Sequence, residues 1–177
     1  MNKKQKGFSL IELLIVVAII LIIAAIAIPN LLRSKMAANQ ASAVGSVRTI
    51  NTAAVSYNST YGNGFPLNLN WIGNNGTTVI SCTNAELVDT VLTSGKKSGY
   101  SFVLSPGTVG VSSSSSSCAT LGYSDGYMVT AVPQALGTTG QTSYCSDASG
   151  VIRQNPTGTL NAGPSPNCAT TDAPLGN

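Results

Sequence analysis

One carboxylate, Glu12, interrupts an otherwise apolar run near the start of the chain. From Phe8 to Ile28 the sequence reads FSLIELLIVVAIILIIAAIAI, and only Ser9 and Glu12 in it are polar. Because an ionised carboxylate is costly in lipid, such a residue is expected to have a function and a charged partner.

The apolar run has the length of a membrane-spanning helix. As a helix, Phe8–Ile28 would be about 31 Å long, which matches the hydrocarbon thickness of a bilayer. Lys3, Lys4 and Lys6 precede it and are expected to remain cytoplasmic, so the rest of the chain would lie across the membrane. Removal of residues 1–7 would lower the formal charge from +3 to zero, because three of the nine basic side chains lie there. The basic balance of the chain is therefore no indication of a nucleic-acid partner.

Three interpretations of this segment compete. The first is a signal anchor that holds a disulfide-stabilised binding domain outside the membrane. The second is a secretory signal peptide cleaved at Ala25–Ala27, although the apolar region is longer than usual and contains an acid. The third is a helix through which copies of the chain polymerise.

The third interpretation is favoured by a family resemblance. The string GFSLIEL, Gly7–Leu13, followed by the apolar run and Pro29, resembles the signature of type IV prepilins, and the short lysine-rich leader resembles their type IVa class. The resemblance implies cleavage after Gly7 by a prepilin peptidase, N-methylation of Phe8, and subunit assembly through Phe8 and Glu12. That cleavage would create a charged partner for Glu12, the α-amino group of Phe8. A pair between Glu12 of one copy and Phe8 of the next would neutralise both charges and set the axial register of packing. Glycine suits the cleavage position because a backbone without Cβ can lie close in a protease groove.

The helix is predicted to continue beyond the apolar run to about Tyr57. Apolar side chains recur at spacings of three and four over this second half, which predicts a stripe that packs against a domain. Its members are Val44, Val47, Ile50, Ala54 and Tyr57. Pro29 is expected to kink or loosen the helix.

The remainder predicts an α+β domain. Residues 58–98 are interpreted as a long loop anchored by Tyr61, Phe65 and Trp71, with a short helix at Asn84–Leu92 whose N-cap is Asn84. Residues 99–153 are predicted to form a four-stranded antiparallel sheet covered on one face by the helix stripe. The strand segments are Tyr100–Leu104, Gly126–Val132, Gln141–Cys145 and Gly150–Arg153. This sheet also resembles that of pilins.

The cysteines indicate an oxidising compartment. Cys82, Cys118, Cys145 and Cys168 contain no CxxC pair and the chain has no histidine, so two disulfides are favoured over a zinc site. Three pairings are possible. The sequential one, Cys82 with Cys118 and Cys145 with Cys168, is favoured because it closes the shorter loops. It would fasten the carboxy-terminal loop and tail, residues 154–177, as is common in the family.

A serine tract is interpreted mainly as a solvated loop, and alternatively as a site of O-glycosylation. Its members are Ser112, Ser113, Ser114, Ser115, Ser116 and Ser117. Two weak N-glycosylation patterns begin at Asn58 and Asn75.

Catalysis is not expected, because the sets of acid, base and nucleophile are missing, and no cofactor is predicted. A calcium site at Asp125, Asp147 or Asp172, as some pseudopilins carry, has no clustered spacing in support. The resemblance implies the precursor of a filament subunit, or alternatively a minor pilin or a pseudopilin of type II secretion. Its implied partners are further copies of itself, a prepilin peptidase and methyltransferase, the assembly machinery and minor pilins. Its implied location is the inner membrane before assembly and an extracellular filament afterwards.

Overall fold

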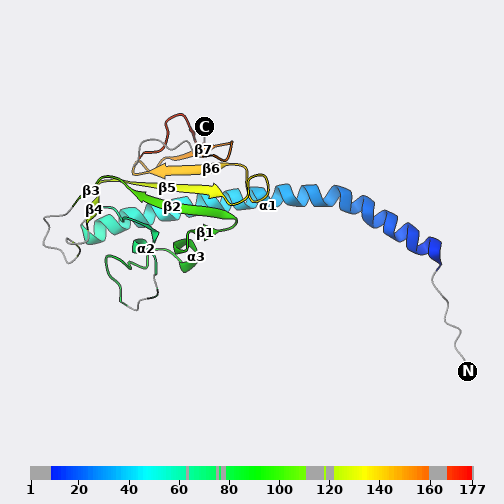
Figure 1. Ribbon diagram of the computed structural model, residues 1–177, viewed down its shortest axis with the longest axis horizontal. Helices are drawn as coiled ribbons and strands as arrows, with labels where there is room; N and C mark the ends of the chain where they lie inside the picture. The colour runs from blue at the N-terminus through cyan, green and yellow to red at the C-terminus, as the bar shows by residue number, and fades with distance from the viewer. Residues whose placement is uncertain are drawn as a thin grey trace, which may run out of the picture. The chain divides into compact units, whose positions relative to one another are not determined.

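The computed structural model describes residues 9–62, 64–74, 76, 79–110, 118, 122–159 and 167–176. The chain divides into two compact units, Met1–Lys35 and Met36–Asn177. The first unit consists, in its described part, of the beginning of helix α1. The second unit contains the rest of that helix and every strand (Figure 1).

Helix α1, Leu10–Tyr61, is 52 residues long and includes Pro29 without a break in the helical assignment. Its second half has one buried face, as the spacing of its apolar residues predicts. Val47, Ile50 and Ala54 are fully buried, and Tyr57 is nearly so. Val44 lies at the margin of the same face and is partly buried. The helix ends at Tyr61 rather than near Tyr57, because the following Gly62 adopts the positive φ that terminates helices.

The main sheet is antiparallel throughout, with the strand order β1-β2-β5-β6-β7-β8. Its four longest strands lie at the segments expected from the sequence, and the α+β class is confirmed. Two short edge strands extend the predicted four. The strands are β1 Lys96–Lys97, β2 Tyr100–Pro106, β5 Tyr127–Pro133, β6 Ser143–Asp147, β7 Ile152–Asn155 and β8 Ala173–Pro174. Strands β3, Val109–Gly110, and β4, Tyr123–Ser124, form a separate ribbon.

The core lies between the second half of α1 and one face of the sheet. Tyr100, Phe102 and Leu104 alternate along β2 and are buried, while Val103 between them is exposed. Figure 1 shows α1 passing behind β2 and β5. A side-chain hydrogen bond also crosses this interface: the Asn51 amide of α1 donates to Ser146 Oγ of β6 at 2.7 Å. Apolar burial and this bond together orient the sheet on the helix.

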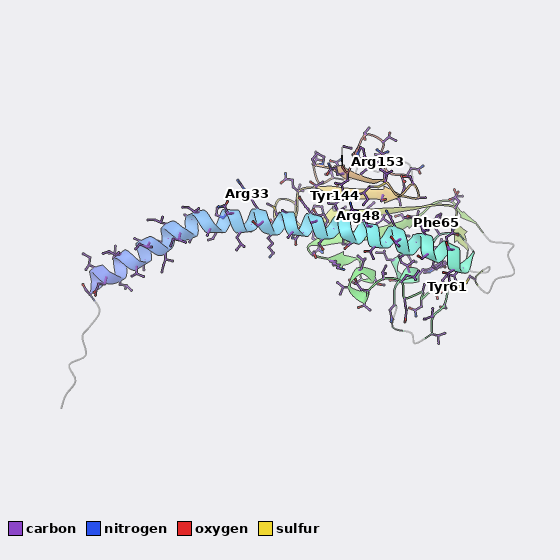
Figure 2. The ribbon with its side chains drawn as sticks, turned by 180° about the vertical axis from the view of Figure 1, so that it is seen from behind. Arg33, Arg48, Tyr61, Phe65, Tyr144 and Arg153 are labelled. Carbon is purple, nitrogen blue, oxygen red and sulfur yellow. A yellow bond between two sulfur atoms is a disulfide. The ribbon has the colours of Figure 1, made fainter. Side chains whose placement is uncertain are left out.

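Tyr57 joins the helix to the long loop that follows it. Its hydroxyl donates to the Cys82 carbonyl at 2.8 Å. Its ring lies 4.8 Å from that of Tyr61 and 6.3 Å from that of Trp71, measured between centroids. Phe65 packs on Tyr127 at 4.9 Å, so the three predicted aromatic anchors all pack against the core. Figure 2 labels Tyr61 and Phe65 near the end of α1. Burial raises the pKa of Tyr57 to about 12, so it remains a neutral donor at ordinary pH.

The helix predicted at Asn84–Leu92 is wrong in extent and in its cap. Asn84 instead exchanges two backbone hydrogen bonds of 3.0 Å with Ser81, and Glu86 has a φ of 52°, which no right-handed helix accommodates. Helix α3 spans only Thr90–Thr93, with Asp89 as its N-cap accepting from the Leu92 N–H at 2.7 Å. A second helix, α2 Leu69–Ile72, capped by Asn68, was not expected from the sequence.

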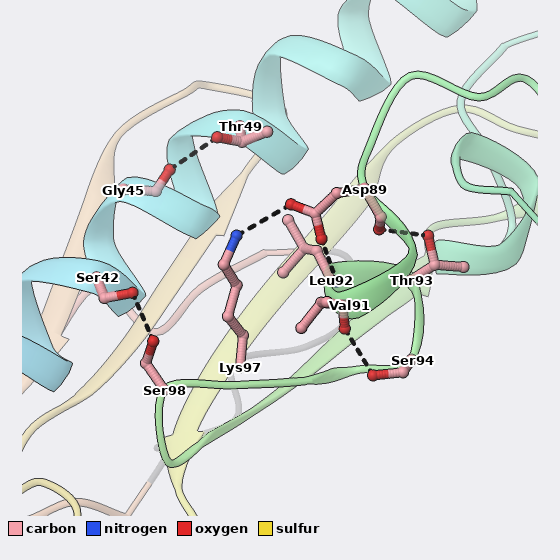
Figure 3. Close-up of polar contacts among 10 residues, drawn as sticks. All are labelled: Ser42, Gly45, Thr49, Asp89, Val91, Leu92, Thr93, Ser94, Lys97 and Ser98. Carbon is pink, nitrogen blue, oxygen red and sulfur yellow. Dashed lines mark hydrogen bonds and ion pairs between the residues drawn. The ribbon is translucent and has the colours of Figure 1, made fainter.

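The hairpin that joins β1 to β2 contacts helix α1. Ser98 and Gly99 have φ angles of 50° and 73°, the pair of positive values that a tight two-residue hairpin turn requires. Ser42 Oγ of α1 donates to Ser98 Oγ at 2.9 Å, and Lys97 on the preceding strand pairs with Asp89 at 3.0 Å (Figure 3). The exposed ion pair contributes little, so the hairpin depends mainly on its turn geometry and on packing.

Two fully buried serines provide a matched test of this core. Ser143 Oγ has no hydrogen-bond partner among the described residues, whereas Ser124 Oγ accepts from the Gly107 N–H at 2.7 Å and donates to the Gly126 carbonyl. We expect Ser143→Ala to change the free energy of unfolding by less than about 0.5 kcal/mol, and Ser124→Ala to lower it by about 1 kcal/mol. Urea unfolding of the detergent-solubilised chain, followed by Trp71 fluorescence, measures both. An equal loss of unfolding free energy in the two variants would contradict the assignment of hydrogen bonds to Ser124 Oγ and of none to Ser143 Oγ.

Candidate functional site

The amino-terminal part of α1 exposes an apolar surface that nothing in its own unit covers. Every residue from Ser9 to Lys35 is exposed except Ala24, which is partly exposed. Among the described residues, α1 alone is long and apolar enough to cross a membrane, as judged by length and composition. A contiguous apolar surface of this size is not stable in water and is typical of a membrane or protein interface.

Glu12 lies in the first turn of this helix, where the sequence places an acid in apolar surroundings. Its Oε2 accepts a hydrogen bond from the Ser9 N–H at 2.9 Å. The Leu13 N–H donates to the Ser9 carbonyl at 3.3 Å, so Ser9 is the residue from which the helix starts. The sequence Ser9-Leu-Ile-Glu12 has the spacing of a capping box, in which a glutamate at the third helical position satisfies an N–H that the helix leaves free.

This contact is one that the sequence analysis missed. The signal was present as a serine three residues ahead of a glutamate, at the start of an apolar periodic segment. The contact satisfies one acceptor site of the carboxylate and leaves its negative charge uncompensated. Gly7 and Phe8, the predicted site of cleavage and methylation, lie outside the described residues.

Pro29 lies inside α1, and the helix assignment continues across it. Proline lacks the N–H that would bond to the carbonyl four residues earlier. The next residue, Asn30, donates its side-chain amide to the Ile26 carbonyl at 3.0 Å. The Ile26 carbonyl, which lies in the helical turn before Pro29, thus has a side-chain donor.

The carboxy-terminal segment is fastened to the sheet by a disulfide and a carboxylate. The structure joins Cys82 to Cys118 and Cys145 to Cys168, which is the sequential pairing favoured from the sequence. Asp147 Oδ2 accepts from the Cys168 N–H at 3.1 Å, and Asp147 Oδ1 accepts from the Ser149 N–H at 3.0 Å. The six serines from 112 to 117 lie outside the described residues.

The three aspartates considered for calcium are each engaged in hydrogen bonds. Asp125 accepts from the Thr108 N–H at 2.8 Å, and Asp172 accepts from the Asn155 amide at 3.0 Å. In the part of the chain that the structure describes, no three carboxylate, histidine or cysteine side chains are grouped as metal ligands would be.

The hydrogen bonds to Asp147 affect its titration. Burial alone would raise the pKa of Asp147, but the bonds from Ser149 and the Cys168 N–H, together with the charge of Arg153, outweigh it and hold the pKa below its usual value. A carboxyl with a lowered pKa in the folded state stabilises the fold above its unfolded pKa, about 4, and loses that contribution as the pH falls through the folded value.

We therefore expect Asp147→Asn to be less stable than the parent chain at pH 7, and the difference to shrink as the pH falls below about 4. The comparison of urea midpoints for the two chains between pH 7 and pH 2 measures this. A difference that stays constant over the whole range would show that the Asp147 charge contributes nothing to anchoring the segment.

The comparisons with known proteins cover only part of the chain. A family model described as the prokaryotic N-terminal methylation motif matches residues 2–28. The type IV major pilin protein PilA of Myxococcus xanthus is 47% identical over 56 residues, which is 32% of this chain and 26% of that protein. The type IV wide pilus major component PilA4 of Thermus thermophilus is 62% identical over 37 residues, 21% of this chain and 28% of that protein.

The matched segments thus span about a quarter of the length of these relatives. No solved structure matches the chain significantly. The chain is therefore similar to type IV pilins in its N-terminal methylation motif and over a part of its length, and its structure is a long helix packed on an antiparallel sheet.

Proposed function

We propose that the chain is the precursor of a structural subunit of a type IV pilus. It is inserted in the inner membrane with its amino terminus cytoplasmic. Residues 1–7 are removed, Phe8 is N-methylated, and the mature chain polymerises with its copies into an extracellular filament. The observation that carries the proposal is the exposed apolar surface of α1 with a single acid, Glu12, in its first turn.

The exposed helix surface needs an apolar environment in both states of the subunit. Before assembly lipid covers it, and after assembly the same surface packs against equivalent helices. Because lipid tails are as apolar as the side chains, this exchange is driven by packing and by polar pairs rather than by the hydrophobic effect. From Ser9 to Leu32, Glu12 is the one charged residue that can supply such a pair.

The choice of partner for Glu12 follows from the distribution of cations. The Ser9 N–H satisfies one acceptor site of the carboxylate but does not neutralise it. Once residues 1–7 are removed, Lys3, Lys4 and Lys6 are gone, and the next basic side chain is Arg33. The Phe8 amine is then the remaining cation at this end of the helix. Its pairing with Glu12 of a neighbouring copy compensates both charges away from water.

The role is structural rather than catalytic. The partners implied are a prepilin peptidase and methyltransferase, an energy-driven assembly machine in the inner membrane, and minor pilins. Pro29 provides a point at which the helix can bend or loosen as subunits pack. The disulfide-bounded carboxy-terminal segment stabilises the part of the subunit exposed on the filament.

The amino terminus of the mature protein tests the class of protein directly. We expect mass spectrometry of chain recovered from sheared filaments to show N-methylated Phe8 as the first residue and no residue from the leader. Filaments composed chiefly of this chain would mark it as the major subunit, and a trace amount would mark it as a minor one. A mature chain that begins at Ile28 would identify a secreted protein and refute the proposal.

The role of Glu12 is tested by substitution. We expect Glu12→Ala to reduce the yield of filaments by at least about tenfold, because the Phe8 amine is left buried without a counter-ion. Ser9→Ala is the matched control, since it keeps the backbone N–H that bonds to Glu12 and should assemble normally. Immunoblots must show equal chain levels and leader removal in both variants. Normal filaments from Glu12→Ala would remove this role.

A further inference from the structure

Two basic residues follow the apolar surface of α1 and have no partner in their own unit. Arg33 and Lys35 are exposed, and their side chains make no hydrogen bond or ion pair with any residue that the structure describes. No acidic residue occurs in the chain between Glu12 and Glu86, so no side chain three or four positions away on the helix can pair with them. Figure 2 labels Arg33 on this part of the helix.

The positions of these two cations on the helix indicate the kind of partner they suit. Successive residues of an α-helix are separated by about 100°, so residues 33 and 35 point to nearly opposite sides. A single protein partner would contact one side of the helix. A layer of lipid head groups surrounds the helix at one level and offers phosphates to both side chains.

The separation between the charges matches a bilayer. The residues between Glu12 and Arg33 are Leu13–Leu32, a helical length of about 30 Å, which is the hydrocarbon thickness. The alternative span, Phe8–Ile28, would place the Glu12 carboxylate inside the hydrocarbon. It would also leave Leu31 and Leu32, which are 70% and 47% exposed, outside the hydrocarbon.

Asn30 carries the one polar side chain within Leu13–Leu32, and this side chain bonds to its own helix. Pro29 has no N–H to satisfy, and the Asn30 amide donates to the Ile26 carbonyl at 3.0 Å. A side-chain donor bonded to its own helix costs less in lipid than a free one. The Asn30 side-chain amide therefore does not prevent the helix from spanning the membrane with Leu13–Leu32.

We propose that the precursor spans the membrane with Leu13–Leu32, and that Arg33 and Lys35 bind anionic phospholipid head groups on the far side while Glu12 lies among the head groups on the near side. This inference rests on the proposed function, because it assumes that α1 is inserted in a membrane. Removal of residues 1–7 takes away every near-side lysine and leaves the far-side pair, so cleavage weakens the attachment of the helix to the near head groups.

Cysteine labelling determines the register. Single substitutions Ala27→Cys, Asn30→Cys and Ser34→Cys are made in the full precursor with both disulfides intact. Each is reconstituted in vesicles of phosphatidylethanolamine and phosphatidylglycerol. It is then treated with a membrane-impermeant maleimide on the side of the membrane that holds the second unit, Met36–Asn177, here called the sheet unit. We expect Ser34→Cys to react, and Asn30→Cys and Ala27→Cys to react at least about tenfold more slowly, because thiols in lipid are not accessible.

The outcomes separate this inference from the proposed function. If Asn30→Cys reacts as fast as Ser34→Cys while Ala27→Cys is protected, the helix spans the membrane in the other register and the inference is overturned. If all three thiols react as fast as that of Ser34→Cys, the helix does not span the membrane and the proposed function fails with the inference.

A second comparison tests the two cations. In the Asn30→Cys chain, the double substitution Arg33→Gln with Lys35→Gln should raise the labelling rate several-fold, because the helix is then free to shift. The matched control, Arg48→Gln with Lys96→Gln, removes two charges elsewhere and should leave the rate unchanged. Replacing phosphatidylglycerol by phosphatidylcholine should raise labelling in the Asn30→Cys chain that keeps Arg33 and Lys35, and not in the chain that also carries the double substitution. Unchanged labelling in the Arg33 and Lys35 variant would refute their binding to head groups.

Discussion

The apolar surface of the first half of α1, which its own unit leaves uncovered, is the constraint on which the rest of the protein depends. A surface of this kind is stable only in lipid or against other apolar helices. The sheet unit therefore folds around the second half of the helix alone. There the buried face of Val47, Ile50 and Tyr57 meets the alternating side chains of β2. One continuous helix thus combines a part that its own chain buries with a part that a second environment must bury.

The sheet unit is small and has few charges, and its stability comes from several local constraints. The disulfides fasten two segments whose described parts have little regular structure, the loop that contains Cys82 and the tail that contains Cys168. Tyr57 connects the first of these segments to the helix, because its hydroxyl bonds to the Cys82 carbonyl. Asp147 connects the second to β6. Cross-links and buried hydrogen bonds of this kind stabilise a domain whose core is limited in size.

Periodicity predicted the elements with strong repeating patterns and failed where single residues decide. The helix stripe and the four main strands follow from spacings of three and four and of two, because burial imposes those periods. The helix expected at Asn84 does not form, because Asn84 pairs with Ser81 and Asp89 is the better cap for the residues that follow. The edge strands β1 and β8 are two residues long, too short to carry any pattern. The Asp147 anchor depends on Cys168, 21 residues away, and no local signal predicts it.

Glu12 was recognisable from the sequence as an anomaly, and the structure changes how its charge is understood. The bond from the Ser9 N–H gives the carboxylate a local role as part of the helix start, which does not need another subunit. This bond orients the carboxylate but does not neutralise it. A charged carboxylate is tolerated near lipid head groups. Its transfer into a bundle of apolar helices is costly unless a cation is buried next to it. The amine freed at Phe8 would be such a cation, so cleavage and burial of Glu12 would be energetically coupled.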